Sequence, residues 1–183
     1  LDRCIEAVGE EHPAWLSLAI KKSNILILAY TKTADQDYLD RAILLFEAML
    51  EKQPDNPSLL NNLAYLLIDN NQQLDTALDY ARKAHQSSPG NAVYLDTYAY
   101  ALCKAGQYEQ AQRQLLRAMQ LNEVSGIPIP WDMYHHIAMA YEGQGDTRQA
   151  LENYQKALEA AADVPDEKKQ QLQEKIRQLK QSL

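Results

Sequence analysis

Alanine recurs along this chain at intervals of roughly 35 residues, and this periodicity limits the fold more than any other feature. The repeated positions are Ala42, Ala77, Ala111 and Ala150. Large side chains such as Phe46, Leu115 and Tyr154 follow one turn later. A period of this length is typical of proteins built from stacked supersecondary units, each of which contacts its neighbours.

Each of these segments is preceded by a second apolar helical pattern, as at 60–64 and 95–99. The pairs predict helical hairpins, because small residues let two helices cross closely. Glycines at Gly106 and Gly145 fall between the two helices of a hairpin, and Pro54 falls between hairpins. The breaks therefore agree with the repeat.

The pattern of a small residue, a large residue, an alanine and a proline, together with the preceding helix, resembles the tetratricopeptide repeat family. The resemblance covers essentially the whole chain. It implies an all-α fold, a right-handed superhelical solenoid of antiparallel helix pairs with a C-terminal capping helix. More narrowly, segments 60–65 and 95–99 resemble bacterial tetratricopeptide proteins of the envelope and of exopolysaccharide secretion.

The breaks divide the chain into the second helix of a partial repeat, a repeat with an extended first helix, two regular repeats, a repeat preceded by an inserted loop, and a capping helix. These parts are 1–13, 14–56, 57–90, 91–124, 125–163 and 164–183.

Four of these parts carry further expectations. In the first, Leu1, Ile5 and Val8 predict a repeat that was cut upstream. Segment 14–33 forms either one long helix or a broken pair. The extra residues at 125–130 predict that the stack bends or loosens there. The capping helix places apolar residues on one face and Lys168 and Lys169 on a solvated face. The apolar residues are Leu172, Ile176, Leu179 and Leu183.

In a stack of this kind, the first helix of each pair lines the concave face. The residue after its small alanine points inward, which gives Tyr30, Tyr65, Tyr100 and Met139. The neighbouring candidates for protein binding are Asn61, Ile68, Asp96, Cys103 and His135. Tyrosines are enriched where partners dock, but they also pack between repeats, and both interpretations stay open.

Charge narrows the class of partner. A formal net charge of -7 argues against nucleic acid, and no apolar run approaches the roughly 20 residues that membrane insertion needs. A protein or peptide of neutral or basic character is favoured by four acidic residues at the concave positions. They are Asp69, Asp96, Asp132 and Glu142.

Relatives that hold the acidic tails of heat-shock chaperones use a clamp of lysines, arginine and asparagines. The corresponding positions here are Leu26, Tyr30, Asn62, Val93 and Thr97. Because only Asn62 matches the clamp, we do not expect capture of an acidic tail.

The sequence offers little evidence of catalysis. The chain has no phosphate-binding loop, zinc-protease motif or nucleophile elbow. His135 and His136 are neighbours and point about 100° apart on a helix, so they cannot share one metal ion. Cys4 and Cys103 fall in helical patterns and are interpreted as small buried hydrophobes. We therefore expect no enzyme activity, no cofactor and no metal site.

The leading hypothesis is a scaffold or adaptor that binds a protein or peptide in the concave groove, as in the assembly of a bacterial multiprotein complex. One alternative is a substrate-recruiting or regulatory domain of a larger enzyme. Another is self-association, in which the apolar residues of segment 1–13 recruit a second copy. The compartment is left open between cytoplasm and periplasm.

Overall fold

The computed structural model describes residues 9, 12, 14–162 and 164–183. The described residues form helices and contain no strand. The helices are α2 (Trp15–Thr33), α3 (Gln36–Lys52), α4 (Pro57–Asp69), α5 (Leu74–Ser87), α6 (Ala92–Lys104), α7 (Tyr108–Val124), α8 (Trp131–Gly143), α9 (Thr147–Ala160) and α10 (Asp166–Gln181). The predictions made on Leu1, Cys4, Ile5 and Val8 lie outside the described residues.

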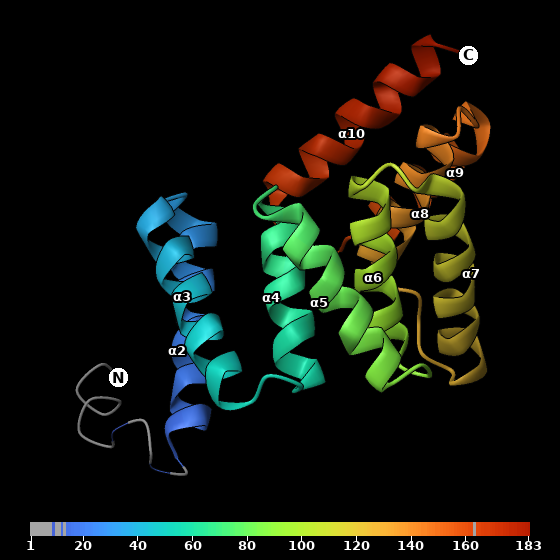
Figure 1. The fold of residues 1–183 in the computed structure, drawn as a ribbon. Coiled ribbons are helices and arrows are strands. Elements are labelled where there is room, and N and C mark those ends of the chain that lie inside the picture. The colour runs from blue at the N-terminus through green and yellow to red at the C-terminus, as the bar shows by residue number, and fades with distance from the viewer. Residues whose placement is uncertain (1–8, 10–11, 13, 163) are drawn as a thin grey trace.

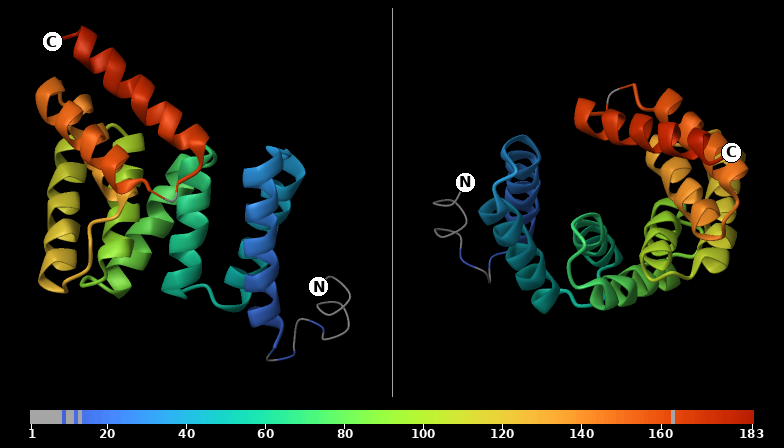
Figure 2. Two further views of the ribbon diagram at one scale, coloured as in Figure 1. Left: turned by 180° about the vertical axis from the view of Figure 1, so that it is seen from behind. Right: turned by 90° about the horizontal axis from the view of Figure 1, so that it is seen from above.

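Consecutive helices pair as antiparallel hairpins, α2 with α3, α4 with α5, α6 with α7 and α8 with α9. The hairpins stack side by side into the curved, all-α solenoid that the sequence predicts (Figure 1). Seen from above, the stack follows an arc with α2, α4, α6 and α8 toward its inner side (Figure 2). None of the described helices is long and apolar enough to cross a membrane.

Local sequence explains where the helices begin and end. The side chain of Asn56 accepts hydrogen bonds from the backbone N–H groups of Ser58 and Leu59, which caps α4. Asn91 caps α6 in the same way. Inside the hairpins, Gly106 and Gly145 adopt φ values of 73° and 79°, a left-handed conformation that suits glycine.

The repeated alanines lie at the helix crossings. Ala42, Ala77, Ala111 and Ala150 are completely buried. The large side chains that follow them one turn later, Phe46, Leu115 and Tyr154, fill the adjoining space and are also buried. The core therefore runs along the stack rather than forming one central mass.

The capping helix α10 packs on α9. It buries Leu172, Ile176 and Leu179 against the last hairpin, while Leu183 is exposed. The predicted cap is therefore present, and Leu183 lies outside its buried face.

Segment 15–33 forms one unbroken helix rather than a broken pair. The stack is looser beside this helix, where the first hairpin meets α4. Within the described residues, the backbones of α2 and α4 stay apart and only side chains connect them, as where Tyr30 donates a hydrogen bond of 2.7 Å to Asn70 after α4, whereas α4 packs on α6 and α6 packs on α8. Of the bend or loosening expected at 125–130, the loosening is wrong, because Ile129 of that loop packs against the core and α7 packs on α8 much as α5 packs on α6. The bend stays a prediction.

Enlarging a crossing alanine should overpack the stack. We expect Ala77→Leu or Ala111→Leu to lower the free energy of unfolding by about 1 to 3 kcal/mol, measured by urea denaturation. Ala160→Leu is the control, because Ala160 is exposed at the end of α9. An equal loss in the control and in either crossing variant would contradict the assigned helix contacts.

Candidate partner-binding surface

A hollow of about 480 Å³ opens on the inner side of the arc, where α2 stands away from α4. We call it the acidic hollow. Its lining residues come from α2, α3, α4, α6 and α8 and from the turn after α4. They are Asn24, Ile27, Tyr30, Thr31, Phe46, Asn61, Asn62, Tyr65, Leu66, Asp69, Asn70, Val93, Asp96, Thr97 and Asp132.

The acidic hollow combines carboxylates with amides and tyrosines. Asp69, Asp96 and Asp132 contribute carboxylates, and none of its described lining residues is lysine, arginine or histidine. Burial is the main cause that raises the pKa of Tyr65, followed by Asp69 and Asp132. This shift indicates that the negative charges converge on the Tyr65 hydroxyl.

Asp132 is the carboxylate with the fewest partners in this hollow. Its Oδ1 accepts a hydrogen bond of 2.9 Å from the backbone N–H of Met133. No basic side chain of the described part of the chain forms an ion pair with it. Burial, and next the charge of Asp96, raise the pKa of Asp132. A bound cation would relieve this repulsion.

Asp96 is held by a buried histidine. The Nδ1 atom of His136 lies 3.0 Å from Oδ1 of Asp96, so the carboxylate accepts a hydrogen bond from the ring. The same ring stacks on Tyr100, with centroids 4.0 Å apart. These contacts join α6 to α8 and fix the orientation of both Asp96 and Tyr100.

Asn61 supplies an unpaired polar atom. Its side chain is only 5% exposed, and its Oδ1 has no hydrogen-bond partner among the described residues. Buried acceptors are normally paired, since an unpaired one costs about 1 to 3 kcal/mol. Asn61 lines the acidic hollow, but this amide oxygen is itself buried beneath the hollow's surface.

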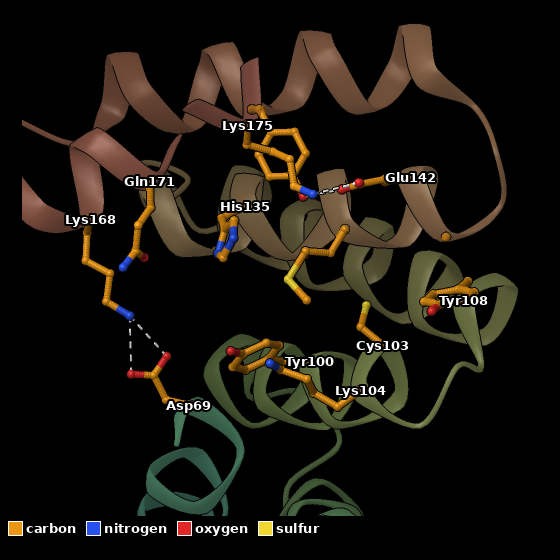
Figure 3. A pocket seen from close by; sticks show the side chains of 13 residues that line it. Asp69, Tyr100, Cys103, Lys104, Tyr108, His135, Glu142, Lys168, Gln171 and Lys175 are labelled. Atoms are coloured by element: carbon orange, nitrogen blue, oxygen red, sulfur yellow. Dashed lines mark hydrogen bonds and ion pairs between the residues drawn. The ribbon is translucent and has the colours of Figure 1, made fainter. Parts of the chain in front are cut away.

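A second hollow, of about 660 Å³, lies between the end of α4, helices α6 and α8, and α10. We call it the covered hollow, because α10 crosses it (Figure 3). Asp69 lines both hollows. The other lining residues are Tyr100, Cys103, Lys104, Tyr108, His135, Met139, Glu142, Gly143, Tyr154, Lys168, Gln171 and Lys175.

Two ion pairs join α10 to the concave face (Figure 3). Nζ of Lys168 lies 3.2 Å from Oδ1 of Asp69 at the end of α4. Nζ of Lys175 lies 2.8 Å from Oε1 of Glu142 on α8. The Tyr154 hydroxyl donates a hydrogen bond of 2.8 Å to the other oxygen of Glu142. The lysine expected on a solvated face, Lys168, thus reaches across to another repeat.

The structure distributes the candidate residues between the two hollows. Tyr30, Asn61, Tyr65 and Asp96 line the acidic hollow, whereas Tyr100, Cys103, His135 and Met139 line the covered hollow. The expectation for Ile68 is wrong, because its side chain is completely buried in the core and lines neither.

The candidate binding residues also differ in how deeply they are buried. Tyr100 and Cys103 are buried, and the Cys103 thiol lies 3.7 Å from the carbonyl oxygen of His136. Burial, then Asp96, raise the pKa of Cys103 to about 12, so its thiol is a weak acid here. Tyr30 and Tyr65 are half-buried and line the acidic hollow. Both also serve packing, because the Tyr30 hydroxyl donates a hydrogen bond of 2.7 Å to Oδ1 of Asn70 and the Tyr65 ring lies 6.2 Å from that of Tyr100.

Sequence reasoning missed the contribution of α10. Lys168, Gln171 and Lys175 all line the covered hollow. Their spacing of three and four residues places them on one face of a helix, which was the available signal. No local pattern indicates the partner carboxylates, because Asp69 lies 99 residues away from Lys168.

Comparison with known proteins agrees with this architecture. One tetratricopeptide repeat model matches residues 45–79, and another matches residues 132–164. This chain contains tetratricopeptide repeats. A TPR repeat-containing protein of Pseudomonas aeruginosa is 31% identical over 72 residues, which are 39% of this chain and 12% of that relative. The matched segment is thus a small part of the relative's length.

Solved tetratricopeptide structures share the fold. MamA from AMB-1 superposes with a TM-score of 0.61 and 22% identity, over 86% of each chain. MamA from Desulfovibrio magneticus RS-1 superposes with a TM-score of 0.53 and 15% identity, over 87% of this chain and 94% of that one. Tetratricopeptide repeats generally serve as protein–protein interaction scaffolds rather than as enzymes, and the two family matches support that role here.

His135 should make stability depend on pH. Burial, followed by repulsion from His136, Lys168, Lys104 and Lys175, lowers the pKa of His135 to about 3. The unfolded chain then binds more protons than the folded chain between this pKa and the ordinary value near 6.5. The free energy of unfolding must therefore fall as the pH is lowered through that window.

We expect acidification from about pH 7 to about pH 5 to cost about 2 kcal/mol through this histidine. His135→Gln should lose correspondingly less, measured by urea denaturation at both pH values. His12→Gln is the control, because His12 is exposed. An identical pH response of the wild type and His135→Gln would refute the assignment.

Proposed function

We propose that this chain is a scaffold that binds a segment of a partner protein along its concave face, with a basic side chain of that segment in the acidic hollow. The observation that carries the proposal is that three carboxylates, at Asp69, Asp96 and Asp132, line one hollow, and that Asp132 has no lysine or arginine partner among the described residues. Charge complementarity of this kind selects partners and suppresses wrong ones.

The walls of the acidic hollow suit the rest of a basic side chain. Tyr65 presents an aromatic ring beside the carboxylates, and such rings attract ammonium and guanidinium groups. Ile27, Phe46 and Leu66 add apolar surface for the aliphatic stem. The unpaired Oδ1 of Asn61 offers an acceptor for a donor of the segment, once small side-chain movements expose it.

The wider setting follows from the same proposal. A scaffold that selects a basic segment suits the assembly of a multiprotein complex, and the Pseudomonas relative supports a bacterial one. Recruitment of a substrate to a larger enzyme and self-association through segment 1–13 stay predictions.

An arginine derivative tests the proposal directly, because it presents the basic side chain without the rest of a partner protein. Titration of the ¹⁵N-labelled chain with N-acetylarginine methylamide should shift the amide resonances of residues that line the acidic hollow. The neutral isostere N-acetylcitrulline methylamide should shift them far less. Asp132→Asn should weaken arginine binding about five- to tenfold, because it removes a partly buried charge and keeps an acceptor for the N–H of Met133.

Asp79→Asn is the matched control, because it removes the same charge from the exposed surface of α5. We expect it to leave arginine binding unchanged. Equal weakening in the two variants would show that only net charge matters, and equal shifts with citrulline would contradict the role of the carboxylates.

A further inference from the structure

Asp69 connects the two hollows and is held by a lysine of α10. Its two carboxylate oxygens lie 3.2 and 3.4 Å from Nζ of Lys168. The remaining carboxylates of the acidic hollow, Asp96 and Asp132, have no lysine or arginine partner within the described chain. Lys168 thus occupies, from within the chain, the type of position that a partner's basic side chain would take.

We infer that the bound segment continues from the acidic hollow into the covered hollow, and that a second basic side chain of the partner replaces Lys168 at Asp69. This inference rests on the proposed function. It adds that the partner segment carries two basic residues, and that α10 competes with the second of them.

The exchange is feasible because the ion pair is exposed. The side chains of Lys168 and Asp69 keep 40% and 32% of their surface accessible to solvent. Exposed pairs of this kind stabilise proteins little, since the two charges interact through water. A partner cation can therefore replace Lys168 at little cost.

The attachment of α10 does not depend on that ion pair. Leu172, Ile176 and Leu179 are buried against the last hairpin. Lys175 remains paired with Glu142 two turns further along α10. Release of Lys168 therefore leaves the helix in place as one wall of the covered hollow.

The covered hollow can accept the chain between the two basic residues. Met139 and the ring of His135 line it, and the lowered pKa of His135 keeps that ring neutral near pH 7. Lys104 is the cation that limits the path, but its ammonium already donates to Oδ1 of Asn71 at 2.8 Å. A segment with basic residues at both ends and neutral residues between them fits this distribution of charge.

The test uses peptides of two arginines joined by glycine spacers of increasing length, acetylated and amidated, with N-acetylarginine methylamide as the single-site reference. Lys168→Ala should bind the best two-arginine peptide about two- to fivefold more tightly than the wild type, because the internal competitor is gone. Binding of the single-arginine reference should tighten less, because Asp96 and Asp132 have no ion pair with Lys168.

Lys169→Ala is the matched control. It removes the same charge one residue away, where Nζ bonds to the carbonyl oxygen of Ala162 and not to Asp69. Asp69→Asn is the second variant, which should weaken the two-arginine peptide more than the single-arginine reference, because Asp69 lines both hollows while Asp96 and Asp132 remain for the single arginine. Thermal melts of all variants establish that each is folded.

The outcomes separate the two proposals. If N-acetylarginine methylamide does not bind the acidic hollow, the proposed function fails and the inference fails with it. If it binds, but Lys168→Ala leaves the two-arginine peptide unchanged or Lys169→Ala tightens it equally, only the competition by Lys168 is overturned.

Discussion

The close crossing of helices at alanine is the constraint on which the rest of the structure depends. Ala42, Ala77, Ala111 and Ala150 are completely buried, so neighbouring helices can approach there without side-chain interference. Hairpins stacked in this way place their first helices on the inner side of an arc (Figure 2). The concave face, with its acidic residues, is therefore a consequence of backbone packing.

The carboxylates that this arrangement gathers are neutralised unequally. Asp96 accepts a hydrogen bond from His136, and Asp69 and Glu142 pair with lysines of α10. Asp132 has only a backbone donor, and the amide oxygen of Asn61 has no partner among the described residues. These two groups leave part of the concave face without matching donors, which favours a ligand with donors and positive charge.

Periodicity made the solenoid and the inward side of each first helix predictable, because both follow from the spacing of small residues. The two hollows were not predictable in this way. Ile68 stands three residues after Tyr65 and so lies near the same helix face, but it is buried in the core rather than exposed to the groove. The separation of α2 from α4 and the reach of Lys168 to Asp69 arise from tertiary packing, for which a single sequence carries no local signal.

Different parts of α10 cover the last hairpin and contact Asp69. A cap has to cover the apolar side of the last hairpin, and Leu172, Ile176 and Leu179 do so. The first turn of α10 lies before these residues, near the end of α4 (Figure 1). Lys168 in that turn contributes nothing to the apolar cover, and its contact with Asp69 is solvent-accessible. The terminal helix can therefore stabilise the stack permanently while its first turn yields to a competing cation.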